Sequence, residues 1–131
     1  QRVRNDDSVV LELRHGGVSI VLPGDIGAAV EDRLAEGDWP RRLRVLKAAH
    51  HGSAGSSSRR WLAALGPSAV VYSAGRGNPF GHPAVPALRR VEQAGAEAFR
   101  TDEDGAVHVA TDGERVAIET MSGRRWMRKA R

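Results

Sequence analysis

Three short apolar runs, each followed by a polar loop, constrain the fold of this chain more than any other feature. The runs are typical of buried strands and comprise residues 18–22, 43–47 and 69–72. The loops after them carry Asp25, the pair His50 and His51, and His82. Sheet edges of this kind are where α/β proteins bind ligands. The sequence therefore predicts one site with a carboxylate and several imidazoles, of the kind that holds a metal ion or a phosphate.

The segments between these runs predict an α/β domain with a mixed sheet. Ile26, Val30 and Leu34 recur at four-residue spacing and indicate a helix over about 25–36. The alternation of strands and helices implies crossover connections in the middle of the chain, with hairpins at both ends. The other expected elements are helices after the serines at 56–58 and over about 84–94, and strands at 8–13, 96–100, 107–109 and 116–119.

The composition limits the chemistry of the site. The chain has no cysteine, which excludes disulfides and thiolate ligands, so a bound metal would be held by imidazole and carboxylate. The net charge is +4, from 20 basic and 16 acidic residues, and five of the basic residues lie in the last eight positions. Without those five, 15 basic residues face 16 acidic ones. We therefore expect a near-neutral folded domain over residues 1–120 and a basic, disordered tail over residues 121–131.

A membrane-spanning helix is not expected. No run approaches the ~20 apolar residues that such a helix needs. The chain starts at Gln1 and enters strand-like sequence almost at once, so we expect it to be a segment of a longer polypeptide.

Structural roles compete with functional ones in the first two loops. The carboxylate of Asp25 is placed to cap the helix that follows it. His50 and His51 are adjacent residues leaving a strand, so they would point to opposite sides, one toward a metal and the other toward a substrate. Gly52 and Ser53 would let backbone amides approach an anion closely. A chance histidine pair in a loop is the alternative.

The third loop holds His82 together with Arg76 and Asn78. Pro83 restricts His82 to extended backbone geometry. A hydrogen bond that only orders the loop is the alternative to a functional role for this histidine.

The remaining histidines and an arginine cluster are expected to be solvated. His15 falls in a turn, and His108 lies on the solvent face of an alternating strand. We expect Arg41, Arg42 and Arg44 to form a solvated face rather than a dedicated nucleic-acid-binding patch.

The loops occur in an order that resembles a known family. The segments that carry the resemblance are NDDSVV at 5–10, LPGDI at 22–26, LKAAHHGS at 46–53, NPFGHP at 78–83 and RTDEDGA at 100–106. Together they resemble the second half of a metallo-β-lactamase-fold hydrolase, specifically the C-terminal domain of ComEC-type competence DNA-uptake proteins. No one segment is specific, but the ordered series covers most of the chain, from about residue 5 to residue 112.

The resemblance implies a four-layer αβ/βα sandwich with two divalent metal ions, zinc or manganese, at one end. Asp25 matches the carboxylate that bridges the two ions, and His51 is favoured as a further ligand. His50 would then face the scissile phosphate as an acid or a charge-stabilising group, with His82 and Ser53 on the substrate side. The residues that would bind substrate are Gly52, Arg76 and Asn78.

The chain also departs from that superfamily. The first metal motif, His-x-His-x-Asp-His or a variant, is absent. The resemblance therefore implies a C-terminal half-domain, whose partners would be the upstream half of the same domain and the membrane channel segments of a parent protein. This would place a soluble domain of a plasma-membrane protein on the extracytoplasmic side. Because dinuclear chemistry needs both ions held ~3.5–4 Å apart, the isolated half should bind metal weakly and catalyse little.

Three functions are compatible with these features. The leading one is a metal-dependent phosphodiesterase that acts on DNA, preferably single-stranded, during uptake. The second keeps the fold and the metals but hydrolyses small phosphodiesters. The third is a non-catalytic domain that binds DNA at a membrane channel through basic residues of the tail, namely Arg124, Arg125 and Arg128.

Overall fold

The strands of the first sheet pair in the order in which they occur in the chain. The computed structural model describes residues 4–131, and this sheet has the order β1-β2-β3-β4-β5. β1 is antiparallel to β2 and the later pairs are parallel, which confirms the predicted mixed sheet. The strands are β1 (Leu11–His15), β2 (Val18–Leu22), β3 (Leu43–Lys47), β4 (Ala69–Tyr72) and β5 (Glu97–Arg100).

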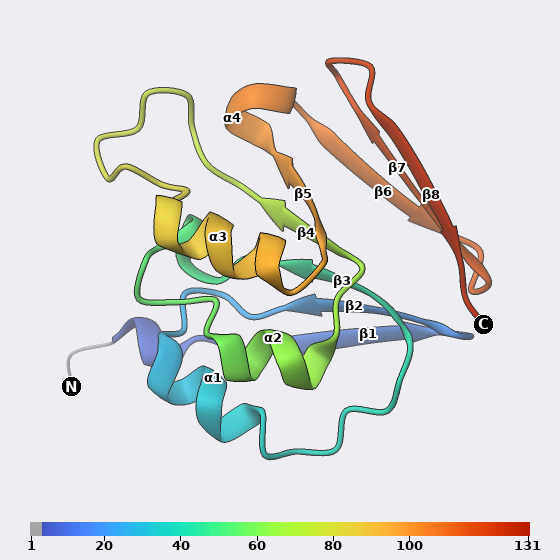
Figure 1. The fold of residues 1–131 in the computed structure, drawn as a ribbon, viewed down its shortest axis with the longest axis horizontal. Helices are drawn as coiled ribbons and strands as arrows, with labels where there is room; N and C mark the ends of the chain where they lie inside the picture. The colour runs from blue at the N-terminus through green and yellow to red at the C-terminus, as the bar shows by residue number, and fades with distance from the viewer. Residues whose placement is uncertain (1–3) are drawn as a thin grey trace.

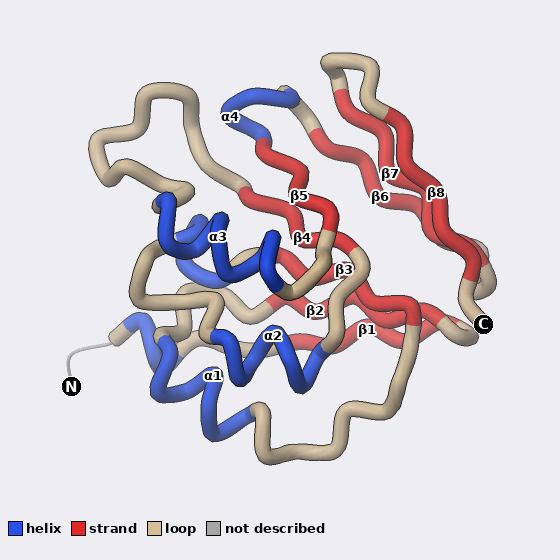
Figure 2. The backbone as a smooth tube through the Cα atoms, viewed as in Figure 1, coloured by secondary structure: helices blue, strands red, loops and turns tan. Residues whose placement is uncertain are grey.

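Three helices cover one face of this sheet (Figure 1, Figure 2). They are α1 (Ala28–Leu34), α2 (Arg59–Leu65) and α3 (Val85–Gln93). Each helix connects two neighbouring parallel strands. Because crossover connections share one hand, strands added in one direction place their helices on one side. The loops that follow β2, β3 and β4 therefore leave the sheet at the same edge.

A second sheet covers the other face (Figure 1). It is antiparallel and consists of β6 (Val107–Thr111), β7 (Arg115–Thr120) and β8 (Arg125–Lys129). The described residues thus form three layers, helices, mixed sheet and antiparallel sheet, which confirms the α/β class. Within residues 4–131, the helices are all too short or too polar to span a bilayer.

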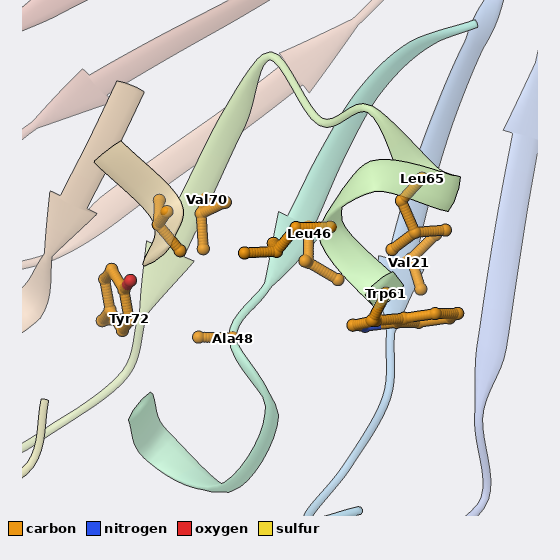
Figure 3. Close-up of a cluster of buried hydrophobic side chains, with 9 residues drawn as sticks. Val21, Leu46, Ala48, Trp61, Leu65, Val70 and Tyr72 are labelled. Atoms are coloured by element: carbon orange, nitrogen blue, oxygen red, sulfur yellow. The ribbon is translucent and has the colours of Figure 1, made fainter. Parts of the chain in front are cut away.

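Alternation along the central strands creates two cores. Val21, Leu46 and Val70 point to the helices and pack with Trp61 of α2 (Figure 3). The core between the two sheets contains Val18, Val45, Ala69, Phe99, Val116 and Ile118. Burying an aliphatic or aromatic side chain fully is worth roughly 1.5–3 kcal/mol, so both faces of the mixed sheet stabilise the fold.

β8 corrects the expectation of a disordered tail over 121–131. Its backbone pairs with β7 at five positions. The ring of Trp126 packs edge-on against Phe99, with centroids 6.1 Å apart. Arg124 lies over the ring of Phe99 and forms an ion pair with Asp104 at 2.9 Å. The basic composition of this segment suggested disorder. The strand is ordered because Trp126 packs against Phe99 and because Asp104, distant in sequence, neutralises Arg124.

Arg44 corrects the expectation of a solvated arginine face. Its side chain is 1% exposed, and its guanidinium lies 3.6 Å from the carboxylate of Glu12. Nη2 donates a hydrogen bond to the carbonyl of Pro40 at 3.0 Å, and the group lies over the ring of Trp39. Burial lowers the pKa of Arg44, and the charge of Glu12 opposes that shift. The residue is a buried structural cation.

The helix-start signals are confirmed for one helix and wrong for another. Ser58 caps α2 by accepting a hydrogen bond from the backbone N–H of Trp61 at 3.2 Å, and Gly66 ends the helix in the left-handed conformation. α1, however, has Gly27 at its N-cap, without a side-chain cap. The expectation that Asp25 caps this helix is therefore wrong, and its carboxylate is free for another role.

The remaining local predictions were also partly confirmed and partly wrong. α3 lies within the predicted helix at 84–94; Val85 in its first turn is 58% exposed, and Ala87 faces the core. The acidic segment at 101–104 forms a short helix, α4 (Thr101–Asp104), that the sequence did not predict. His15 and His108 are exposed, as expected.

The tips of two hairpins meet at the edge opposite to the loops after β2, β3 and β4. The backbone N–H of Gly17 donates to the carbonyl of Gly113 at 2.8 Å. A Cβ at Gly16, which has a φ of 55°, would collide with that carbonyl, and one at Gly17 would lie 2.9 Å from the Cβ of Ala130. This approach therefore requires glycine and joins both sheets to the end of the chain.

Candidate functional site

Backbone hydrogen bonds tie the three polar loops together at one edge of the mixed sheet. The N–H of His50 donates to the carbonyl of Gly24 at 3.0 Å, which joins the loops after β2 and β3. The N–H of Ala84 donates to the carbonyl of Gly52 at 2.8 Å, which joins the loops after β3 and β4. The predicted convergence of Asp25, the histidine pair and His82 is therefore confirmed at the level of the loops.

Asp25 and His51 form the centre of the site. The Nε2 atom of His51 lies 3.8 Å from Oδ1 of Asp25, and both side chains are about half exposed (50% and 41%). Nδ1 of His51 lies 2.8 Å from the carbonyl oxygen of Ser73. A carbonyl only accepts, so Nδ1 carries the hydrogen and, in the neutral ring, the Nε2 lone pair faces the carboxylate. A cation between Nε2 of His51 and Oδ1 of Asp25, either a proton or a metal ion, would stabilise this arrangement of two facing acceptors.

His50 and His51 both adopt left-handed backbone conformations, with φ of 50° and 57°. This corrects the expectation that the pair leaves its strand in an extended conformation. For residues other than glycine such a conformation costs of order 1–2 kcal/mol each, and such strain clusters at binding and catalytic sites. The two rings nevertheless separate, with centroids 6.4 Å apart.

The two histidines face different cavities. His51 lines a cavity of about 470 Å³ together with Ser73, Phe80 and His82. His50 lines a smaller one of about 230 Å³ together with Asp25, Ser53 and others. The division of the pair between two environments, predicted from extended geometry, thus arises from the strained turn instead.

Gly52 is buried beneath its neighbours rather than open to a ligand. A Cβ there would lie 2.7 Å from the ring of Tyr72 and 2.8 Å from Cβ of Pro83, and the φ of 86° also favours glycine. The glycine lets the histidine loop pack against the loop after β4. Its expected contact with substrate stays a prediction, whereas its packing role is evident.

His82 lies between the histidine pair and an exposed aromatic ring. Its ring centroid is 5.7 Å from that of His50 and 5.9 Å from that of Phe80, with which it stacks. Among the residues that the structure describes, its buried Nδ1 atom has no hydrogen-bond partner. Burial lowers the pKa of His82, and the nearby charges of His50 and His51 act in the same direction. These surroundings favour a neutral imidazole.

The side chain of Asn78 orders the loop around His82. Its Nδ2 donates to the carbonyl of His82 at 2.6 Å, and its Oδ1 accepts from the His82 N–H at 3.1 Å. Both ends of this amide are thus occupied by backbone. Arg76 is exposed, and its Nε donates to the carbonyl of Asp102 at 3.4 Å. Of the two residues expected to bind substrate, Arg76 has the more accessible side chain.

Three residues for which the sequence predicted no role in the site interact with Asp25 or with the loop that carries it. The backbone N–H of Asp25 donates to Oγ of Ser8 at 3.1 Å, and the N–H of Gly27 donates to Oδ1 of Asp6 at 2.9 Å. Lys47 ends β3 near the site; burial lowers its pKa, and the charge of Asp25 opposes this. The polar segment at 5–8, which precedes a strand, was the available signal for the first two.

Two of the described side chains, those of Asp25 and His51, are close enough together to bind one metal ion. No group of three or more histidine, aspartate or glutamate side chains within residues 4–131 is arranged to hold a metal ion. The 3.8 Å between Asp25 and His51 is less than the sum of two bonds of ~2.0–2.2 Å, so one ion can bind both. The contact from His51 to Ser73 is the kind of outer hydrogen bond that orients a metal-binding imidazole. Fold and site thus define an α/β domain with a carboxylate and an imidazole side by side at the carboxyl edge of its parallel strands.

Comparisons with known proteins relate the chain to competence proteins. It is 32% identical over 104 residues to ComE operon protein 3 of Bacillus subtilis, a match that covers 79% of this chain and 13% of that protein. It is 36% identical over 105 residues to competence protein ComA of Neisseria gonorrhoeae, covering 79% and 15%. It is 30% identical over 118 residues to recombination protein 2 of Haemophilus influenzae, covering 90% and 15%. No family model matches the chain.

These matches support the competence family that the ordered motifs indicated. The chain spans only 13–15% of the length of these relatives. The metallo-β-lactamase fold itself rests on the motifs and not on these names.

Proposed function

We propose that this chain is the C-terminal half of a metallo-β-lactamase-like domain that hydrolyses phosphodiester bonds of DNA, preferably single-stranded, with the help of divalent metal. The carrying observation is the Asp25–His51 pair, in which the carbonyl of Ser73 directs the Nε2 lone pair of His51 toward the carboxylate. The similarity to competence proteins supports DNA rather than a small phosphodiester as the substrate.

Asp25 and His51 would hold zinc or manganese. A bound ion would supply Lewis-acid stabilisation of charge on a phosphate oxygen. The hydrogen bond from Nδ1 of His51 to Ser73 fixes the tautomer and the orientation of the ring. Hydrogen bonds to the backbone at Asp25 and Gly27 fix the loop that carries the carboxylate. Both ligands are therefore held in place before any ion binds.

His50, His82 and Ser53 would act on the substrate. His50 and Ser53 line the cavity that contains Asp25, so they lie on the side where a phosphate would approach. The imidazole of His82 lies 5.7 Å from that of His50 between ring centroids; burial lowers its pKa, and it would accept or donate a proton.

A segment outside these 131 residues would complete the site. Two protein ligands are fewer than the three or four that zinc sites in proteins use. In this proposal the missing ligands come from the upstream half of the domain in a membrane-bound competence protein, where the domain would face the extracytoplasmic side.

Metal binding to the chain itself tests the first step. Zinc or manganese titrated into the protein should shift the imidazole NMR signals of His51 before those of His15 and His108. Asp25→Ala should abolish this shift, whereas His108→Ala, an exposed control on β6, should leave it unchanged. Equal responses of all five histidines would contradict a metal site at Asp25 and His51.

Cleavage tests the second step and needs the longer polypeptide that carries the proposed upstream half. It should cut single-stranded DNA only with added metal, and Asp25→Ala should remove the activity. A preference for small chromogenic phosphodiesters over DNA would identify the alternative substrate class. Cleavage that persists after chelation, or in Asp25→Ala, would refute the proposal.

A further inference from the structure

A basic groove lies at the opposite edge of the molecule from Asp25 and His51. It has a volume of about 630 Å³ and runs between the start of β3 and the end of β8. The residues that line it are Gly17, Pro40, Arg41, Arg42, Leu43, Ser68, Arg128, Lys129, Ala130 and Arg131. Five of these are basic and none is acidic. One wall comes from the segment before β3 and the other from the C-terminal strand.

The charges of the groove are not neutralised by the protein. Within residues 4–131, none of its five basic side chains takes part in an ion pair. Arg42 donates from Nη1 to the carbonyl of Gly16 at 2.6 Å, which holds its guanidinium in the wall, while its buried Nε has no acceptor among those residues. Arg128 lies over the ring of Trp126 and is likewise held in place. The groove thus combines fixed cations with unused donors.

Two of the three arginines that were expected to bind DNA form ion pairs outside the groove. Arg124 pairs with Glu97 and Asp104, each at 2.9 Å, and Arg125 lies 3.8 Å from Glu119. Of the three expected residues only Arg128 lines the groove. The positive potential of the tail is therefore concentrated where β8 ends and where Arg41 and Arg42 face it.

We infer that this groove binds successive phosphates of a single nucleic-acid strand. Five unpaired cations on two walls exceed what one phosphate needs, and a concave site suits a strand better than a flat lipid surface. No aromatic side chain lines the groove, so it offers no platform for base stacking. Contacts would be to the backbone, and binding would depend little on base sequence.

The groove is separate from the candidate metal centre. Leu43 begins β3, whereas Asp25 and His51 lie in loops beyond the opposite ends of the strands. At ~3.3 Å per residue, β3 alone separates the two by about 13 Å. A nucleic-acid strand can therefore be held here whether or not it is cut at the other edge, and the two proposals can fail independently.

The test is binding of a labelled single-stranded oligonucleotide to the full chain in the presence of EDTA. The double variant Arg41→Ala with Lys129→Ala removes one cation from each wall, and neither side chain makes a hydrogen bond or an ion pair within residues 4–131. Arg33→Ala with Arg89→Ala removes the same charge from exposed positions on α1 and α3. Each lost phosphate contact should weaken binding about 5-fold near 0.1 M salt, so the groove variant should bind about 25-fold more weakly. The slope of log K against log salt should fall in magnitude by about 1.4.

The control variant should bind within about 2-fold of the wild type, and oligonucleotides of different sequence should bind alike. Equal losses in both double variants would show an effect of net charge alone and overturn the inference. Displacement of the strand by micromolar inorganic phosphate would indicate a site for one phosphate and would also overturn it. So would binding to vesicles of anionic lipid without binding to the oligonucleotide.

Discussion

Replacing Glu31 by glutamine should stabilise the protein much more at alkaline than at acidic pH. Glu31 lies on α1 with its side chain fully buried, and burial raises the pKa of its carboxyl to about 7. Hydrogen bonds from the backbone of Ser58 and Ser57 and the charge of Arg90 oppose the rise, while Asp32 adds to it. Oε2 accepts from Ser58 at 3.2 Å, and Oε1 has no partner among residues 4–131.

The direction of this pH dependence follows from the difference in the pKa of Glu31 between the folded and the unfolded protein. The folded pKa of about 7 exceeds the ordinary value of 4.5, so the unfolded chain gives up this proton more readily than the folded protein. The wild type therefore carries no penalty from Glu31 well below pH 4.5, loses stability as the pH rises from 4.5 to 7, and stays at the lower level above 7. At 1.36 kcal/mol per pKa unit the penalty is roughly 0.8 kcal/mol near pH 5 and roughly 3.3 kcal/mol near pH 8.

Urea unfolding of the wild type and Glu31→Gln near pH 5 and near pH 8 measures this difference. The free-energy gain from the substitution should be about 2.5 kcal/mol larger at the higher pH. Glu92→Gln, at an exposed position on α3, should show no such change. An equal gain for Glu31→Gln at both pH values would refute the reasoning, because it would mean that the carboxyl titrates normally in the fold.

Two further substitutions test how the site is held. Gly52→Ala should destabilise the fold by about 2–4 kcal/mol in urea unfolding, because the new Cβ would lie 2.7 Å from Tyr72 and the φ of 86° is unfavourable for alanine; a change below 1 kcal/mol, roughly the cost of a surface substitution, would contradict this. Asn78→Ala removes four hydrogen bonds to the loop backbone, two of them to His82, and should cost about 2–4 kcal/mol, with mobility of the 78–83 loop visible in amide NMR. An unchanged loop spectrum would show that Pro83 alone orders it.

The sequence predicted the parts of the fold that depend on local pattern. β2 was expected at residues 18–22 and lies there, and α2 begins after the predicted serine cap, at Ser58, and ends at a left-handed glycine, Gly66. These features follow from alternation, capping and left-handed glycine, which act over a few residues. β8 was missed because its stability comes from contacts of Trp126 and Arg124 with residues distant in sequence.

The sequence predicted which loops form the site, but not the backbone conformation of the histidine loop or the residues around Asp25. Three strand ends bring Asp25, His51 and His82 to one edge, which parallel strands require. The left-handed turn at His50 and His51 could not be predicted, because residues other than glycine rarely adopt this conformation and nothing in the local pattern indicates it. Lys47 and Ser8 were missed because their roles depend on proximity to Asp25 in space.

The contact between Gly17 and Gly113 has a consequence for how the chain folds. It joins positions 17 and 113 of the 131 residues, so it brings the first hairpin of this chain against a hairpin that follows the parallel strands. The parallel strands and their helices can assemble from neighbouring segments, but the core between the sheets has to wait for the last hairpin. Such long-range closure slows folding. On the ribosome, one face of the mixed sheet would therefore remain uncovered until β7 and β8 emerge.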